Sequence, residues 1–509
     1  MTTTVLELQN ITKRFGTLTA NDDISLKLER GEILAFLGEN GAGKTTLMNI
    51  LFGHYVPDEG RVFVKGAEIP QGKPRAAIDA GVGMVHQHFT LAPNLTVLET
   101  SITGTESLWK LKSAQGAAHA KIAQIAKRFG LQVDPDARLG DLSVGEQQRV
   151  EILKALYNDA DILILDEPTA VLTTQEAEGL FITLKEMARQ GLSLIFISHK
   201  LHEVMSAADR VVVLRGGKLV AERQASETTK EELAELMVGR RVSRPSRAAA
   251  TPGETLLEAK NVTVVEDGTA RLTDLDFHLR AGETLGIIGV SGNGQAALGR
   301  LVSGLSQPAS GSLVMFGQTV NKFDPRQFVG AGVGRVPEDR NAEGAIGDLT
   351  LWENAVLERI RDPQFSNGLL VNRAAAREFT DRIIKDFDVR GGTPDSRIRL
   401  LSGGNMQKLI LGRNLETAPR ILIAAQPTRG LDEGAVAAIH ARILEARAKG
   451  AAVLLISEDL DEIIGLADRV QAIVKGRLSP PIDAGQANAQ RLGLMMAGEW
   501  QTNTAKGLN

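Results

Sequence analysis

The residues best suited to chemistry lie in a glycine-rich loop near the start of the chain. The stretch "GENGAGKTT" begins at Gly38, follows the apolar run "EILAFL" and precedes the helical pattern "KTTLMNILFG". This is the GxxxxGK(S/T) spacing, placed between a strand and a helix. Backbone N–H groups of such a loop point at a phosphate chain, while Lys44 reaches the terminal phosphates and the Thr45 hydroxyl binds Mg²⁺. The loop therefore predicts phosphate and metal binding.

Two adjacent carboxylates form the second chemical feature. The apolar run "ILIL" ends in Asp166 and Glu167, and burying two acids costs free energy unless a metal or a reaction needs them. Asp166 is predicted to hold Mg²⁺ through its water, and Glu167 to polarise the attacking water. Acids at a strand end are more often helix caps or solvated loop residues. Together with the glycine loop, however, they favour phosphoryl transfer.

Three further residues carry less information by themselves. Gln87 stands in "MVHQHF", His199 follows the apolar run "LSLIFIS", and Phe15 stands in "TKRFG". A lone His at a strand end is usually structural, and a lone Phe usually belongs to the core. Their meaning depends on a family.

The elements that position these residues occur twice. "LELQNITKRFG" matches "LEAKNVTVVED", "LSVGEQQRV" matches "LSGGNMQKL", and "ILILDEPTA" matches "ILIAAQPTR". Lys44 stands opposite Gln295, an offset of 251, whereas Asp166 stands opposite Ala425, an offset of 259. The offset is expected to change once, by 8 residues, between the glycine loop and the LS-G motif. Two such offsets over most of each half indicate duplicated domains rather than a solenoid.

The repeats and composition predict the domain plan. A first domain is expected at residues 1–242, a linker in the Pro-, Ala- and Ser-rich stretch 243–253, and a second domain at 254–509. Each half alternates short Val/Ile/Leu strands with helical patterns, which predicts an α/β fold with a mostly parallel sheet covered by helices. A more helical insert, for example "AAHAKIAQIAKRFG", precedes the LS-G motif and is interpreted as a helical subdomain.

Bulk composition excludes several classes of protein. The 509 residues have a formal net charge of -4 without a long basic run, which argues against a nucleic-acid binder held mainly by phosphates. The absence of Cys excludes disulfides and thiolate metal sites. The N-terminus lacks the pattern of a signal peptide, and the longest apolar runs fall short of the ~20 residues that span a bilayer. Any membrane crossing is therefore expected from other chains.

The order of glycine loop, Gln, LS-G-E-Q, LDEP and SH resembles the nucleotide-binding subunits of ABC transporters, twice over nearly the whole chain. The resemblance implies two tandem P-loop ABC-type domains, each with an antiparallel β portion, that use ATP and Mg²⁺. It also implies that Phe15 stacks on adenine, that Gln87 senses the γ-phosphate and Mg²⁺, and that His199 contacts the γ-phosphate. The nucleotide-binding loop comprises Gly38, Glu39, Asn40, Gly41, Ala42, Gly43, Lys44, Thr45 and Thr46.

Domains of this family pair head to tail, which implies two composite sites. The first would combine the Walker residues of the first half with a segment of the second, namely Ser402, Gly403, Gly404, Asn405 and Asp432. In the second site, the replacements would be Gln295, Ala296, Glu338, Ala425, Gln426 and Glu458, with Val144 and Thr173 lent by the first half. The departures from the family pattern all fall in the second composite site, whichever half supplies the residue. One hydrolytic site and one regulatory or empty pocket are therefore expected.

Fused halves with a degenerate second half resemble importers of monosaccharides and nucleosides. The stretches "MVHQHFTLAPNLTVLE" and "AAQPTRGLD" are similar to the nucleoside-type branch, although the sugar branch stays an alternative. The implied partners are two transmembrane permease subunits and, through them, an extracytoplasmic substrate-binding protein, with no nucleic acid. The implied location is peripheral, on the cytoplasmic side of the inner membrane. The alternative from another class is a tandem ATPase that acts on ribosomes. Such proteins usually keep two working sites and a long, charged linker, whereas this chain has a short linker and one degenerate site.

Overall fold

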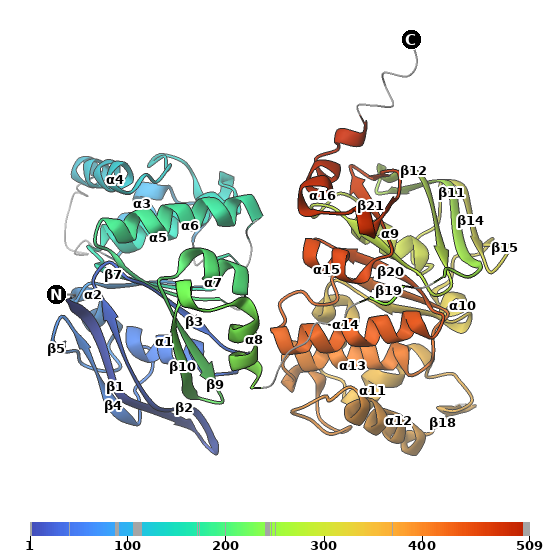
Figure 1. Cartoon of the computed structure of the whole chain (residues 1–509), viewed down its shortest axis with the longest axis horizontal. Helices are drawn as coiled ribbons and strands as arrows, with labels where there is room; N and C mark the ends of the chain where they lie inside the picture. The colour runs from blue at the N-terminus through green and yellow to red at the C-terminus, as the bar shows by residue number, and fades with distance from the viewer. Residues whose placement is uncertain are drawn as a thin grey trace, which may run out of the picture. The chain divides into compact units, whose positions relative to one another are not determined.

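The computed structural model describes residues 3–501 except 40, 87–90, 105–114, 170, 171, 173, 199, 240–244, 246, 250 and 369. The chain forms two compact units, one built mainly from residues 1–242 and the other from residues 243–431 and 435–509 (Figure 1). Each unit contains a mostly parallel sheet, an antiparallel sheet and a group of helices. The predicted α/β class is confirmed.

The central sheet of the first unit has the strand order β10-β9-β3-β8-β7-β6. Its strands are β3 (Ile33–Leu37), β6 (Val82–Val85), β7 (Ile162–Asp166), β8 (Ser193–Ile197), β9 (Arg210–Arg215) and β10 (Lys218–Gln224). All neighbours pair in parallel except β9 and β10. Every residue of β3, β7 and β8 is buried, which explains why these strands read as continuous apolar runs.

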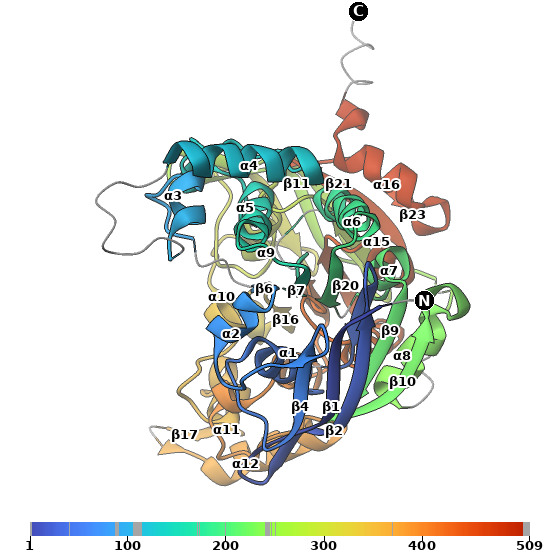
Figure 2. The same ribbon diagram turned by 90° about the vertical axis from the view of Figure 1, so that its left-hand side faces the viewer.

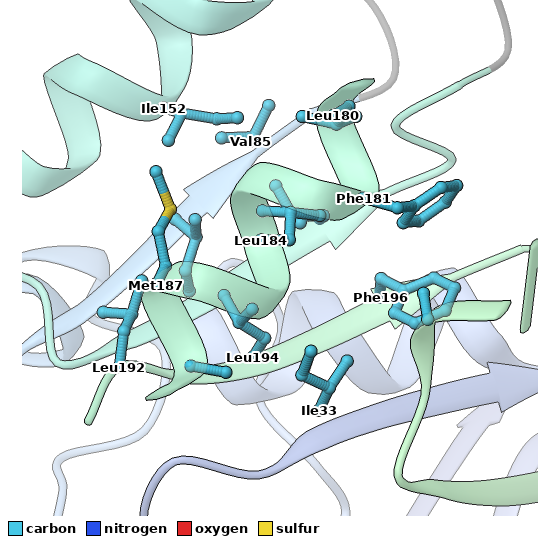
Figure 3. Close-up of a cluster of buried hydrophobic side chains, with 14 of the residues drawn as sticks. Ile33, Val85, Ile152, Leu180, Phe181, Leu184, Met187, Leu192, Leu194 and Phe196 are labelled. Atoms are coloured by element: carbon cyan, nitrogen blue, oxygen red, sulfur yellow. The ribbon is translucent and has the colours of Figure 1, made fainter. Parts of the chain in front are cut away.

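The two faces of this sheet belong to different cores because strand side chains alternate. On one face, Leu194 and Phe196 of β8 pack against Leu184 and Met187 of α6 (Thr174–Arg189), as Figure 3 shows. On the other face, residues such as Ile195 pack with α1 (Lys44–Phe52) and the antiparallel sheet. The strands that carry the chemistry are therefore fixed from both sides.

The antiparallel sheet of the first unit has the order β2-β1-β4-β5. Its strands are β1 (Thr4–Phe15), β2 (Leu18–Glu29), β4 (Glu59–Val64) and β5 (Ala67–Glu68). In Figure 2, β1, β2 and β4 lie at the bottom of this unit and α4 (Gln115–Phe129) lies across its top. The helical region also holds α3 (Val97–Ile102) and α5 (Val144–Tyr157), and further helices are α2 (Pro74–Asp79), α7 (Leu201–Ala207) and α8 (Lys230–Val238).

The second unit repeats this plan with the sheet order β16-β19-β20-β13-β21-β22, and β23 also pairs with β21. These strands are β13 (Thr284–Ile288), β16 (Val333–Val336), β19 (Ile421–Ala425), β20 (Ala452–Ser457), β21 (Arg469–Val474), β22 (Arg477–Leu478) and β23 (Ile482–Asp483). The antiparallel sheet is formed by β11 (Thr255–Glu266), β12 (Thr269–Arg280), β14 (Ser310–Met315) and β15 (Gln318–Thr319).

Helices of the second unit correspond to those of the first. They are α9 (Gln295–Val302), α10 (Pro325–Gly330), α11 (Leu351–Val356), α12 (Arg373–Asp386), α13 (Gly403–Leu415), α14 (Glu433–Ala448), α15 (Leu460–Leu466) and α16 (Ala489–Met496). A hairpin of β17 (Ser366–Asn367) and β18 (Leu370–Val371) precedes α12. Within the described residues, no helix has both the length and the apolarity needed to cross a bilayer.

The expectation of one 8-residue change in the repeat offset is wrong, because the extra residues are spread over more than one place. Corresponding strands begin at Val82 and Val333, an offset of 251, whereas the following helices begin at Val97 and Leu351, an offset of 254. The offset reaches 259 only in the loops before α5 and α13. The first insertion coincides with a π-helix at Arg340–Gly344, and another lies between α11 and α12, because α4 and α12 begin at Gln115 and Arg373, an offset of 258.

Candidate functional site

The glycine loop of the first unit joins β3 to α1 through backbone conformations that require glycine. Gly43 forms the N-cap of α1 with φ 100°, and a Cβ atom there would lie 2.2 Å from the carbonyl oxygen of Ala20. A Cβ atom at Gly38 would lie 2.3 Å from the carbonyl oxygen of Leu214. Side chains are thus excluded at both ends of the loop, which leaves its backbone free to approach a phosphate chain.

Lys44 is folded back over this loop. Its Nζ donates hydrogen bonds to the carbonyl oxygens of Gly38 at 2.6 Å and Glu39 at 3.0 Å, and the residue is 7% exposed. Burial lowers the pKa of Lys44, while the carboxylates of Glu167 and Asp166 act in the opposite direction. Among the described residues, the printed hydrogen-bond acceptors of its ammonium group are neutral carbonyl oxygens. The ammonium group would therefore gain from a phosphate, because charge-assisted hydrogen bonds are stronger than neutral ones.

The remaining loop residues are placed as a phosphate cradle needs them. Ala42 is buried, whereas Gly41 and Thr45 are exposed and Glu39 and Thr46 are half-buried. Asn40 lies outside the described residues. Thr45 is the second residue of α1, so its hydroxyl stands at the helix N-terminus, where partial positive charge favours anions.

Asp166 and Glu167 stand at the end of β7, as the sequence predicts. Asp166 is the last residue of the strand and is 7% exposed. Glu167 has φ 48°, in the left-handed region, and its backbone N–H donates to the carbonyl oxygen of Ile197 at 3.1 Å. Burial raises the pKa of Asp166, as does the neighbouring Glu167, while His86 and Lys44 lower it. Lys44 and the two acids therefore share one electrostatic neighbourhood.

The donor set of this neighbourhood fits Mg²⁺. Mg²⁺ is typically bound through one or two carboxylates together with substrate phosphates and water, rather than by a full protein cage. Asp166 supplies a buried carboxylate. Its burial disfavours the charged form, and a bound cation would favour that form again. Thr45 is exposed and supplies a hydroxyl. Among the described residues, no group of three or more His, Cys, Asp or Glu side chains forms a metal cage.

Phe15 is half-exposed rather than part of the core. It stands at the end of β1, opposite Leu18, and 45% of it is accessible. Its ring meets the edge of Tyr55 at a centroid distance of 5.7 Å, and Lys13 Nζ lies 5.4 Å from its centroid. An exposed aromatic face fits stacking on a planar base. In the second unit, Glu266 stands at this position and forms an ion pair with Arg300.

The two LS-G segments begin similar helices with different charge. Ser143 caps α5 in a capping box with Glu146, whose pKa the Ser143 hydrogen bonds lower. Ser402 begins α13 without a side-chain cap, and its Oγ accepts a 2.9 Å hydrogen bond from Asn405 Nδ2. The first helix thus presents an anion at its N-terminus, while the second presents neutral groups.

The other residues of these segments are placed simply. Gly403 is half-buried and Gly404 is buried in the first turn of α13, Val144 is exposed, and Asp432 lies just before α14. A helix N-terminus with Gly residues and a neutral third position suits phosphate binding better than one with a carboxylate.

The second unit keeps the frame of the site without its chemistry. Gln295 replaces the Lys, and its Nε2 donates to the carbonyl oxygen of Val290 at 2.8 Å, much as Lys44 binds its own loop. Gln426 keeps the left-handed conformation of Glu167, with φ 46°, and its N–H donates to the carbonyl oxygen of Ile456 at 2.7 Å. Ala296 and Ala425 supply no metal ligand.

Two carboxylates, Glu338 and Glu458, stand where the sequence of the first unit has Gln87 and His199. Glu338 forms a 2.7 Å ion pair with Arg429, and the backbone N–H of Glu458 donates to Gln426 Oε1 at 3.4 Å. Burial raises the pKa of Glu458, while Arg429 lowers it. A carboxylate at either position, when ionised, would oppose the binding of a triphosphate there.

Three residues named from the sequence cannot be tested by the geometry. Gln87, His199 and Thr173 lie outside the described residues, so their roles stay predictions. His86, by contrast, is described, and its ring stacks on His54 at a centroid distance of 5.7 Å.

Asn21 is a functional candidate that the motifs did not reveal. It is fully buried, and its Nδ2 donates to the carbonyl oxygen of Gly43 at 3.1 Å. Leu272 occupies the corresponding position in the second unit, 251 residues later. Asn21 thus supports the glycine loop only in the half that has the complete site. A comparison of the repeats for polar residues opposite apolar ones could have found it.

Comparison with known proteins gives consistent matches. The ABC transporter family model matches residues 21–170 and 272–429. The "Glucose import ATP-binding protein TsgD13" of Haloferax volcanii is 43% identical over 97% of this chain and 96% of its own. The "Nucleoside import ATP-binding protein NupA" of Lactococcus lactis is 43% identical over 97% and 98%, and the "Guanosine import ATP-binding protein NupO" of Bacillus subtilis is 43% identical over 99% of both chains.

A solved structure extends the likeness in fold to the tandem arrangement. The crystal structure of the complex of an archaeal ribosomal stalk protein with the ribosome recycling factor aABCE1 matches with a TM-score of 0.63, over 96% of this chain and 92% of that chain. The identity is 18%, so this match concerns the fold alone.

Proposed function

The chain belongs to the ABC transporter family, and from this premise we propose that it hydrolyses ATP at the glycine loop of its first unit to energise the import of nucleosides. The observation that carries the proposal is the unequal chemistry of the two repeats. Lys44, Asp166 and Glu167 are present in the first unit, whereas Gln295, Ala425 and Gln426 replace them in the second. Phosphoryl transfer depends on positioning and charge neutralisation, so hydrolysis belongs to the first.

Each site residue of the first unit has a proposed role. Lys44 exchanges its carbonyl partners for the terminal phosphates of ATP, and Glu167 accepts a proton from the attacking water or orients it. Thr45 and Asp166 would hold Mg²⁺, which when bound would supply positive charge to the phosphate oxygens. Phe15 stacks on the adenine. Gln87 and His199 are proposed to contact the metal and the γ-phosphate, as their place in the family motifs implies.

The Ser402–Asn405 segment and Asp432 are proposed to complete this ATP site. The neutral N-terminus of α13 supports the assignment, because a phosphate there meets no carboxylate at the third helical position. Binding of ATP is proposed to close the site, and hydrolysis is proposed to reopen it. These two steps would drive the transport cycle.

The import ATP-binding relatives imply membrane permeases as partners. We infer two permease subunits that receive an extracytoplasmic substrate-binding protein, and a peripheral place on the cytoplasmic side of the membrane. Nucleoside cargo is supported by two relatives whose names specify nucleoside or guanosine import, and sugar cargo by an equally similar glucose relative.

The test is the ATPase rate of the chain reconstituted with its permeases in lipid. Substrate-binding protein loaded with a nucleoside or with a monosaccharide is added in parallel, and the Glu167→Gln variant serves as the control for hydrolysis. Stimulation by the nucleoside form supports the cargo assignment, and stimulation by the sugar form alone refutes it. Normal turnover by Glu167→Gln would refute the proposed base.

A further inference from the structure

A buried carboxylate contacts the loop that carries Glu167. Glu203, in the first turn of α7, is 2% exposed. Its Oε1 accepts a 2.5 Å hydrogen bond from Thr169 Oγ1, and its Oε2 accepts a 2.8 Å hydrogen bond from Ser198 Oγ. Lys200 Nζ completes the shell, 3.1 Å from Oε1. The carboxylate therefore has a polar partner on each oxygen and a counter-charge.

The partners of Glu203 come from two different loops. Thr169 belongs to the segment after β7, two residues beyond Glu167, and Ser198 and Lys200 belong to the segment after β8. Lys200 Nζ also lies 3.4 Å from the carbonyl oxygen of Thr169, which joins the same two segments by a second route. Glu203 is thus the link through which one loop fixes the position of the other.

Resting on the proposed function, we propose that Glu203 is a positioning residue for hydrolysis: it sets the loop that carries Glu167 against the loop that follows β8. The first loop is also anchored from its other side, where the buried Gln148 donates to the carbonyl oxygen of Pro168. A misplacement of about 1 Å can cost about a hundredfold in rate, so a link of this kind acts on turnover.

The second unit provides an internal comparison. Glu462 corresponds to Glu203, is also 2% exposed, and accepts a 2.7 Å hydrogen bond from Thr428. The basic side chain beside it is different, because His440 Nε2 of α14 lies 3.0 Å from its Oε1. Asp459 stands where the first unit has Lys200.

The difference between Glu203 and Glu462 distinguishes two roles of the buried carboxylate: stabilising its own unit, which both can do, and connecting the two loops of the site. In both units, a Thr after the β7-type strand binds the buried Glu. In the first unit, a basic side chain beside the carboxylate, Lys200, comes from the loop after β8, whereas in the second the basic side chain, His440, comes from a packed helix. The additional connection between loops therefore accompanies the unit that has Lys44, Asp166 and Glu167.

The experiment compares matched variants of the two units in the full chain assembled with its permeases. Glu203→Gln and Thr169→Val are tested against Glu462→Gln and Thr428→Val, with MgATP as substrate. We measure kcat, KM and the thermal midpoint, with rates taken below the lowest midpoint. The first-unit variants are expected to lose about tenfold in kcat with KM changed less than about twofold. The second-unit variants should keep kcat within about twofold.

Two outcomes overturn the proposal. One is a fall in the thermal midpoint of Glu203→Gln and Thr169→Val without a fall in kcat, since the carboxylate would then be architectural only. The other is an equal loss of kcat in the second-unit variants. Thr169→Val is isosteric and keeps the test valid if Glu203→Gln does not fold. Glu167→Gln is measured in parallel. If it loses turnover while the Glu203 and Thr169 variants do not, the positioning role fails and the proposed hydrolytic function stands.

Discussion

Asp166 shows how a site residue can work against the stability of its own fold. Burial raises its pKa above the ordinary value, so the folded state holds a proton more readily than the unfolded state does. Between the ordinary and the raised pKa, stability therefore increases as pH falls, the reverse of a salt-bridged Asp. The ionised form needed for Mg²⁺ is correspondingly lost at a higher pH than for an exposed Asp.

We predict that Asp166→Asn abolishes Mg²⁺-dependent ATP hydrolysis and raises the thermal midpoint at neutral pH by about 2 °C, since it removes a buried charge worth about 1 kcal/mol. Calorimetry and ATPase assays check both. The reverse change, Ala425→Asp at the corresponding position, should lower the midpoint without creating activity. A lower midpoint for Asp166→Asn would contradict the account.

Lys44 leads to a second prediction at this scale. Lys44→Ala should lower ATPase activity by at least about a hundredfold, because it removes the cation that meets the terminal phosphates. Gln295→Ala, which removes a side chain bound only to its own loop, should leave the rate within about twofold. Steady-state ATPase assays decide, and equal losses in the two variants would show that the second pocket contributes to chemistry.

At the scale of the elements, the Ser residues that begin the two LS-G helices are expected to have different roles, one in capping its helix and the other in binding a ligand. Ser143 makes a capping box, and loss of such a cap costs about 1 kcal/mol. Ser402 caps nothing with its side chain and is exposed. We predict that Ser143→Ala lowers the free energy of unfolding by about 1 kcal/mol with little effect on the ATPase rate. Ser402→Ala should do the opposite and lower the rate several-fold.

Denaturant titrations and ATPase assays on the same preparations test this pair. The interpretation fails if Ser402→Ala is as destabilising as Ser143→Ala, since its hydroxyl would then be a cap. It also fails if Ser402→Ala leaves the rate unchanged.

The elements also show what could be predicted from the sequence. The apolar runs that become β3, β7 and β8 are buried on both faces, so composition alone predicts them. The site follows because Asp166 ends β7 and Lys44 begins the helix that the glycine loop joins to β3. Glu203 and Asn21 could not be identified in this way, because a buried polar residue is defined by long-range partners that no local pattern records. The π-helix at Arg340–Gly344 could not be predicted for a related reason: the motifs on either side give the total change in repeat offset, but not where the extra residues lie.

At the scale of the whole molecule, the link between the repeats is held by the second unit. Arg447 is 3% exposed on its side chain and makes a bidentate pair with Asp468, with both N–O distances at 2.7 Å. Its third nitrogen donates to the carbonyl oxygen of Ala248 at 3.1 Å, and Arg247 lies 3.5 Å from the same carboxylate. Arg247 and the carbonyl group of Ala248 are therefore anchored to the second unit, although the composition of this segment predicts only a linker.

The corresponding residue in the first unit is Ala188, so this device belongs to one repeat. We predict that Arg447→Met lowers the free energy of unfolding of the second unit by about 2 kcal/mol, because Asp468 loses its bidentate partner. It should also increase tryptic cleavage after Arg247, since the segment loses its anchor. Calorimetry should show a shift in one transition while the other stays in place, because the two units have separate cores. An equal shift of both transitions would mean that the units unfold together, and unchanged cleavage would mean that Arg447 stabilises its own unit without holding the linker.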